Sequence, residues 1–167
     1  MTKFLLSLHV LAAIIAVGPV TVAASMFPPS ARKALAEPGS ERAVAALRLL
    51  HRICRVYGGV GIAVPVLGFA TAMSMGVLND TWLIVSMLLT ALAAMVLLAL
   101  VLPRQEEILA GLGGTATGSS TTGSPATGTA VDTRATARLA MFTGVFNLLW
   151  ATVTILMIVR PGSTTGA

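Results

Sequence analysis

Four long apolar stretches, separated by short polar segments, dominate the pattern of this chain. They cover residues 4–27, 56–78, 81–103 and 139–159, and none of them contains a charged side chain. A helix needs about 20 mostly apolar residues to cross a hydrocarbon layer about 30 Å thick, where its backbone groups must bond to one another. The pattern therefore predicts an all-α protein, a four-transmembrane-helix bundle whose helices run alternately up and down.

Prolines and polar turn residues set the expected ends of these helices. Proline lacks a backbone N–H and so interrupts helical hydrogen bonding. The expected stops are Pro28-Pro29 for the first helix, Pro103 for the third and Pro161-Gly162 for the fourth, and Asn79 or Asp80 is expected to cap the third.

The first stretch has an alternative reading as a cleaved signal peptide. Lys3 gives it a charged start, and the small residues at 22–25 are typical of a cleavage site. Its apolar part is longer than the usual 7 to about 15 residues of a signal sequence, and an arginine-rich segment follows. An uncleaved membrane helix is the favoured interpretation.

The second helix is expected to start well before the membrane. Residues 40–56 contain good helix formers and no glycine or proline. A helix over 41–75 would be about 50 Å long, so that about its first third lies in the headgroup region or the cytoplasm. Pro65 is expected to kink it.

One face of this extension is basic. In a helix, Arg48, His51, Arg52 and Arg55 fall within an arc of about 100°. Two interpretations fit. The arc either contacts an anionic lipid or ligand, or its arginines reach the interface and fix the topology of the chain.

The segment 111–133 interrupts the apolar pattern before the fourth stretch. It is rich in Gly, Ser and Thr and has little apolar bulk, which predicts a flexible cytoplasmic linker. Its Gly113-Gly114 pair is not followed by the Gly-Lys-Ser/Thr of a phosphate-binding loop.

Composition supports a membrane protein, and the distribution of charge predicts its orientation. The chain of 167 residues is 56% hydrophobic and 10% charged, with a mean hydropathy of +0.90, against about 25% charged in a soluble domain. Lys and Arg exceed Asp and Glu by 11 to 6. Nine of these basic residues belong to the first and third connections: Arg32, Lys33, Arg42, Arg48, Arg52, Arg55, Arg104, Arg134 and Arg138.

Only Lys3 and Arg160 lie on the other side. The positive-inside rule then predicts a multi-pass protein of the cell (plasma) membrane, with both termini outside and loops 1 and 3 in the cytoplasm. The basic residues are too scattered for a nucleic-acid surface, so no nucleic-acid partner is expected.

Candidate chemistry is sparse. His9 is the only Asp, Glu, Lys, Arg or His residue inside a stretch, which makes it a possible ligand or proton group. The other histidine, His51, would lie roughly 25 Å away and could not share a metal with it. All six carboxylates lie outside the stretches, which argues against a proton-coupled transporter. The single cysteine, Cys54, forms no Cys-X-X-Cys motif.

The remaining polar and small residues of the stretches predict helix packing. Close helix approach is expected at Gly58, Gly59, Gly61 and Gly68 of the second stretch, and interhelical hydrogen bonds at Asn147 and Trp150 of the fourth. No Ser/His/Asp set or zinc motif is found in the sequence, so no enzyme and no catalytic residue is predicted.

The chain resembles a family of predicted bacterial integral membrane proteins of unknown function, itself similar to the membrane domain of copper-resistance D-type proteins. The resemblance lies in Leu8-His9-Val10-Leu11-Ala12 followed by Gly18, the arginine-rich segment 48–55, and Trp82. It implies a four-helix membrane fold and, through the copper-resistance likeness, metal handling at His9. The eight methionines are scattered and form no copper-binding cluster.

Three functions follow, in order of preference. The first is a non-enzymatic accessory or scaffold component of the cell membrane, bound to other membrane subunits or to itself and to lipids, including anionic ones, and with no cofactor. The second is a redox protein that binds copper or haem through His9, and the third is a small-solute transporter.

Overall fold

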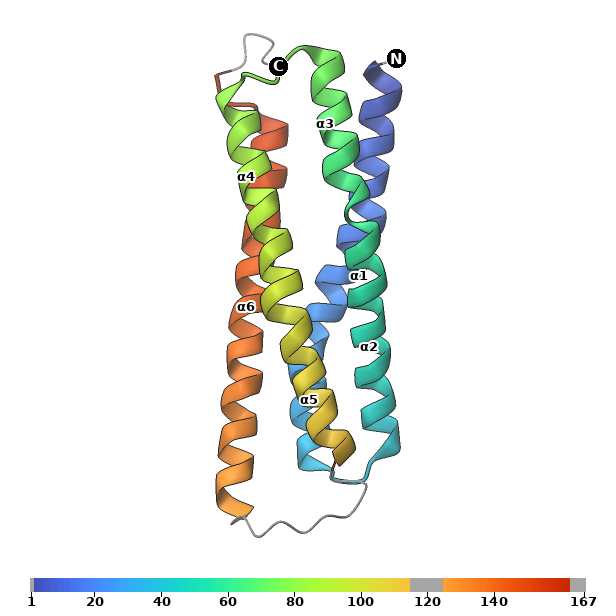
Figure 1. Ribbon diagram of the computed structural model, residues 1–167, viewed down its shortest axis with the longest axis vertical. Helices are drawn as coiled ribbons and strands as arrows, with labels where there is room; N and C mark the ends of the chain where they lie inside the picture. Colours follow the sequence, from blue (N-terminus) through green and yellow to red (C-terminus); the bar gives the residue numbers. More distant parts are fainter. Residues whose placement is uncertain (1, 115–124, 163–167) are drawn as a thin grey trace.

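The protein is an all-α bundle of four long helices, each long and apolar enough to cross a membrane (Figure 1). The computed structural model describes residues 2–114 and 125–162, and the side chains of residues 2–112 and 134–162. The helices run alternately up and down, so the N-terminus, the α3–α4 turn and the C-terminus lie at one end, here called the terminal end. The predicted fold class is confirmed.

The first helix, α1 (Thr2–Ala36), continues through the tandem proline that was expected to stop it. Each proline removes only one backbone donor, and the turns beyond them are fixed by packing. Phe27, Pro28, Ala31 and Ala34 are all buried against the rest of the bundle. Burial of this segment therefore outweighs the two lost hydrogen bonds.

The second long helix consists of α2 (Glu41–Val60) and α3 (Ala63–Met75). Ser40 caps its start, because its hydroxyl oxygen accepts from the backbone N–H of Ala43 at 3.4 Å. The two parts meet at Gly61–Ile62, one turn before Pro65. Since Pro65 has no N–H for the Gly61 carbonyl, the Val64 N–H donates to it instead, at 3.1 Å. This is the bend expected from Pro65.

The third long helix also passes its expected end. It comprises α4 (Thr81–Met95), a π-helical segment η1 (Val96–Val101) and α5 (Leu102–Gly114). Pro103 does not close it: the helix continues from η1 through Pro103 into α5, whose next turn is packed into the bundle at the buried Gln105. Figure 1 shows the helix crossing the bundle, with α4 beside α6 and α5 beside α2.

The fourth helix, α6 (Pro125–Val159), starts well before residue 139. Of the predicted linker 111–133, residues 111–114 belong to α5 and residues 125–133 to α6, while residues 115–124 lie outside the described part of the chain.

An apolar belt surrounds the half of the bundle next to the terminal end. Its exposed large apolar side chains lie on residues 4–26, 56–73, 84–100 and 141–159, which corresponds to about 25–35 Å on each helix. This matches a hydrocarbon layer of about 30 Å. Exposed Arg55, Arg104 and Arg138 follow it directly on three helices, and the bundle beyond them is here called the basic end.

Candidate functional site

His9, the predicted ligand or proton group, lies buried between α1 and α3. Its Nδ1 is 3.0 Å from the carbonyl oxygen of Val64. A carbonyl can only accept, so Nδ1 carries a proton in this contact. The ring fits only because Gly68 lacks a side chain, since a Cβ there would lie 2.9 Å from the His9 Cε1.

At the basic end, His51 belongs to a polar network that joins α2 to α5. Its Nδ1 lies 3.0 Å from Oε1 of Gln105, whose Nε2 donates to the Cys54 sulfur at 3.6 Å. Gln105 and Cys54 are fully buried. On the outer side of the network, His51 Nε2 is 3.5 Å from the carboxylate of Glu106.

This network was not predicted as a unit. Gln105 and Glu106 follow Pro103, which was expected to end the helix, so they were assigned to a loop. The signal that could have found them is the uncharged Gln105 within an apolar helical pattern that continues to Leu112.

The three arginines of the predicted basic arc point away from the bundle. Arg48, Arg52 and Arg55 are all exposed, whereas His51 turns inward to α5. None of the three forms an ion pair with another residue of the described side chains. The carboxylate nearest along α2 is Glu41, about two turns before Arg48. The structure thus divides the arc into a half-buried histidine that contacts α5 and three exposed arginines without an ion-pair partner among the described side chains.

An apolar cavity of about 110 Å³ lies inside the belt, between all four long helices. Phe146 and Trp150 form one wall, with their rings edge to face at 6.4 Å between centroids. The opposite part is bordered by Tyr57 and Gly58 of α2 and by Gly61 at the break that follows it. The lining residues Ile62, Pro65, Ala94 and Leu98 are exposed on the belt. The cavity therefore opens sideways to the lipid.

The predicted packing glycines occupy different surroundings. A Cβ at Gly58 would approach the Leu97 side chain to 3.3 Å, so this position and Gly68 allow close contacts within the bundle. Gly61 lies at the break between α2 and α3. Gly59 is exposed, with no atom near its Cβ position.

Asn147 joins α6 to α1 in the part of the belt nearer the basic end. Its Nδ2 donates to the Ser25 hydroxyl oxygen at 3.0 Å, while its Oδ1 is buried and has no partner among the described residues. The hydroxyl of Thr143, one turn away, is also buried and unpaired within this part of the chain. Thus His9 contacts α3, Asn147 contacts α1, and Trp150 lines the cavity. The three side chains do not converge on one polar site.

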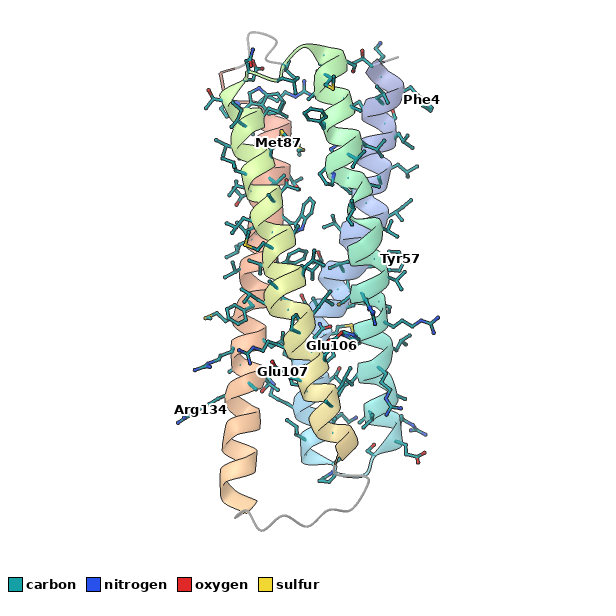
Figure 2. All side chains as sticks on the ribbon, viewed as in Figure 1. Phe4, Tyr57, Met87, Glu106, Glu107 and Arg134 are labelled. Carbon is teal, nitrogen blue, oxygen red and sulfur yellow. The ribbon has the colours of Figure 1, made fainter. Side chains whose placement is uncertain are left out.

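The terminal end is closed by contacts between α4 and the end of α6. Trp82 donates its ring N–H to the Asp80 carboxylate at 3.0 Å, and the Arg160 guanidinium lies 5.5 Å from the centre of the Trp82 ring. Figure 2 places Phe4 and Met87 toward this end, and Glu106, Glu107 and Arg134 toward the other.

Within the described residues, no three His, Cys, Asp or Glu side chains are grouped to hold a metal ion. Comparison of the chain with protein-family models, curated proteins and solved structures finds no match.

Proposed function

We propose that this membrane protein is a non-enzymatic accessory or scaffold component of the cell membrane, which binds a transmembrane helix of another membrane protein across α1 and α6. The supporting observation is the hydrogen bond between exposed Ser25 and Asn147. Asn147 lies about 13 Å from Arg138 along α6, well inside the apolar belt. A polar pair at this depth favours association with another helix.

The surface around this pair also permits close approach of a partner. Gly18 on α1 and Gly144 on α6 are exposed, and no atom lies within 4 Å of the Cβ position of either. Gly18 is two turns from Ser25 and Gly144 is one turn from Asn147, so each glycine shares a helix surface with one member of the pair. Small residues at such positions let two helix backbones approach.

Purification in mild detergent, followed by identification of bound membrane proteins, tests this proposal. We expect a stoichiometric partner that is lost on Gly144→Leu or Gly18→Leu. Ala91→Leu adds the same side chain to an exposed position of α4 in the belt and should keep the partner. A partner-free monomer from the native membrane would contradict the proposal.

His9 supports a second candidate, a redox protein that binds copper or haem. Histidines that ligate a metal usually donate their other ring N–H to a carbonyl or carboxylate, as His9 Nδ1 does to Val64. The other ligands would have to come from the metal group itself or from another chain. Absorption spectra and metal content of the native protein, compared with His9→Ala, decide this candidate, and the absence of chromophore and metal from both would exclude it.

A further inference from the structure

We infer that the protein binds an anionic phospholipid at a site on α2, with the phosphate on Arg48, Arg52 and Arg55 and one acyl chain in the lateral cavity. This inference depends on the membrane-spanning fold and not on the accessory role proposed above. It joins two independent features of the structure, the unpaired arginines and the cavity that begins beside them.

The depth of the arginines suits a lipid phosphate. Arg55 follows the apolar belt directly, and Arg52 and Arg48 lie about 5 and 10 Å further along α2. The headgroup layer on each side of a bilayer is about 5–7 Å thick. An arginine whose backbone lies beyond this layer, toward the basic end, can extend its side chain back into it. Guanidinium groups bind phosphate oxygens through paired, charge-assisted hydrogen bonds. No carboxylate of the described residues neutralises these three cations.

The cavity gives the acyl chain a place next to that headgroup. Tyr57 and Gly58 line it and lie about 3–5 Å beyond Arg55 along α2. Ile62, seven residues after Arg55 and on the same helix face, stands at its exposed mouth.

The size and polarity of the cavity also fit a hydrocarbon chain. At about 110 Å³, it approaches the roughly 150 Å³ apolar cavity that accepts benzene, and so has room for a short segment of a chain. Water would find few partners inside, because almost all of the surface that lines the cavity is apolar.

The basic residues of α6 provide a comparison within the same protein. Both arginines of α6 are exposed on the basic-end side of the belt, as those of α2 are. Arg138 lies directly beside the belt, and Arg134 lies one turn further from it. The cavity residues of α6 begin only at Phe146, about 12 Å from Arg138. These two arginines meet the same leaflet without a neighbouring place for a chain.

The headgroup is tested by native mass spectrometry of protein taken from vesicles of equal parts phosphatidylcholine and phosphatidylglycerol. The wild type should retain phosphatidylglycerol in preference to phosphatidylcholine. Removing one arginine should weaken this preference about fivefold. The double variant R52Q/R55Q should therefore weaken the preference about 25-fold. The control R134Q/R138Q should change the preference less than about twofold. Equal losses in both variants would mean general attraction to the leaflet and would overturn the inference.

The acyl chain is tested separately, without a change of charge. Ala94→Leu narrows the exposed mouth of the cavity and should abolish retention of phosphatidylglycerol, while Ala91→Leu, exposed on the same helix outside the lining, should not. Unchanged retention in Ala94→Leu would overturn the inference. So would binding of inorganic phosphate in detergent that is lost in R52Q/R55Q, because the ligand would then be a free anion.

Discussion

At the scale of single residues, His9 and Gly68 form a tightly constrained contact in the belt. A Cβ at residue 68 would meet the His9 ring at 2.9 Å, and the ring is held by its bond to Val64. Gly68→Ala should therefore lower the free energy of unfolding by about 1–3 kcal/mol, although alanine normally stabilises a helix by about 0.5–1 kcal/mol over glycine. Unfolding in mixed detergent micelles measures this difference.

Two further variants separate the clash from other effects of the substitution. In the His9→Ala background, Gly68→Ala should cost much less, because the ring that it meets is gone. Gly144→Ala, at a glycine with open space around it, should be neutral or stabilising. If Gly68→Ala costs the same with and without His9, the close contact does not set the requirement for glycine.

The residues of this contact were only partly predictable from the sequence. His9 could be found because it is the only Asp, Glu, Lys, Arg or His residue within the four apolar stretches. Its partner is a backbone carbonyl on another helix, which no residue type reveals. Gly68 was predicted to permit close approach, but a histidine ring as the approaching group depends on the relative rotation of α1 and α3.

At the scale of elements, the π-helical segment η1 sets the rotation of α5 against α2. A π-helix forms i→i+5 hydrogen bonds and contains an extra residue relative to an α-helix. Because the segment already takes up one extra residue, insertion of a further alanine after Leu100 should turn α5 by about 100°. Gln105 would then leave His51 and Cys54, which it now contacts at 3.0 and 3.6 Å.

The single cysteine reports this rotation directly. Cys54 is fully buried in the folded protein, so it should react slowly with a membrane-permeant thiol reagent, and at least about tenfold faster after the insertion, in line with a local loss of more than about 1.4 kcal/mol. Gln105→Leu keeps the packing and should react slowly. Equal rates for the insertion and the wild type would show that η1 does not set the rotation of α5.

Element boundaries were the least predictable part of the fold. The sequence rule that proline ends a helix was wrong at Pro28-Pro29 and at Pro103. In both places the helix continues because the following turn is buried, as at Ala31 and Gln105. That burial comes from other helices, so local sequence does not report it. Pro65, by contrast, produced the expected bend, since its effect lies within its own helix.

At the scale of the whole molecule, the sequence predicted the bundle because the bilayer imposes length and polarity on each crossing helix separately. What it could not predict is the arrangement of the helices around the lateral cavity. The cavity exists because α4 packs on α6 while α3 packs on α1. Such pairing depends on side-chain shape across helices that are far apart in the chain.

The orientation of this bundle in the membrane remains a prediction of the charge count, and two exposed connections test it. Glu37 lies in the α1–α2 connection at the basic end, and Asn79 in the α3–α4 turn at the terminal end. Both variants are made in a Cys54→Ala background, which removes the native thiol. Asn79→Cys should react with an impermeant thiol reagent in intact cells. Glu37→Cys should react with the same reagent only after the cells are lysed. The reverse pattern would place the basic end outside, against the charge bias of the loops, and would move Arg48, Arg52 and Arg55 to the outer leaflet.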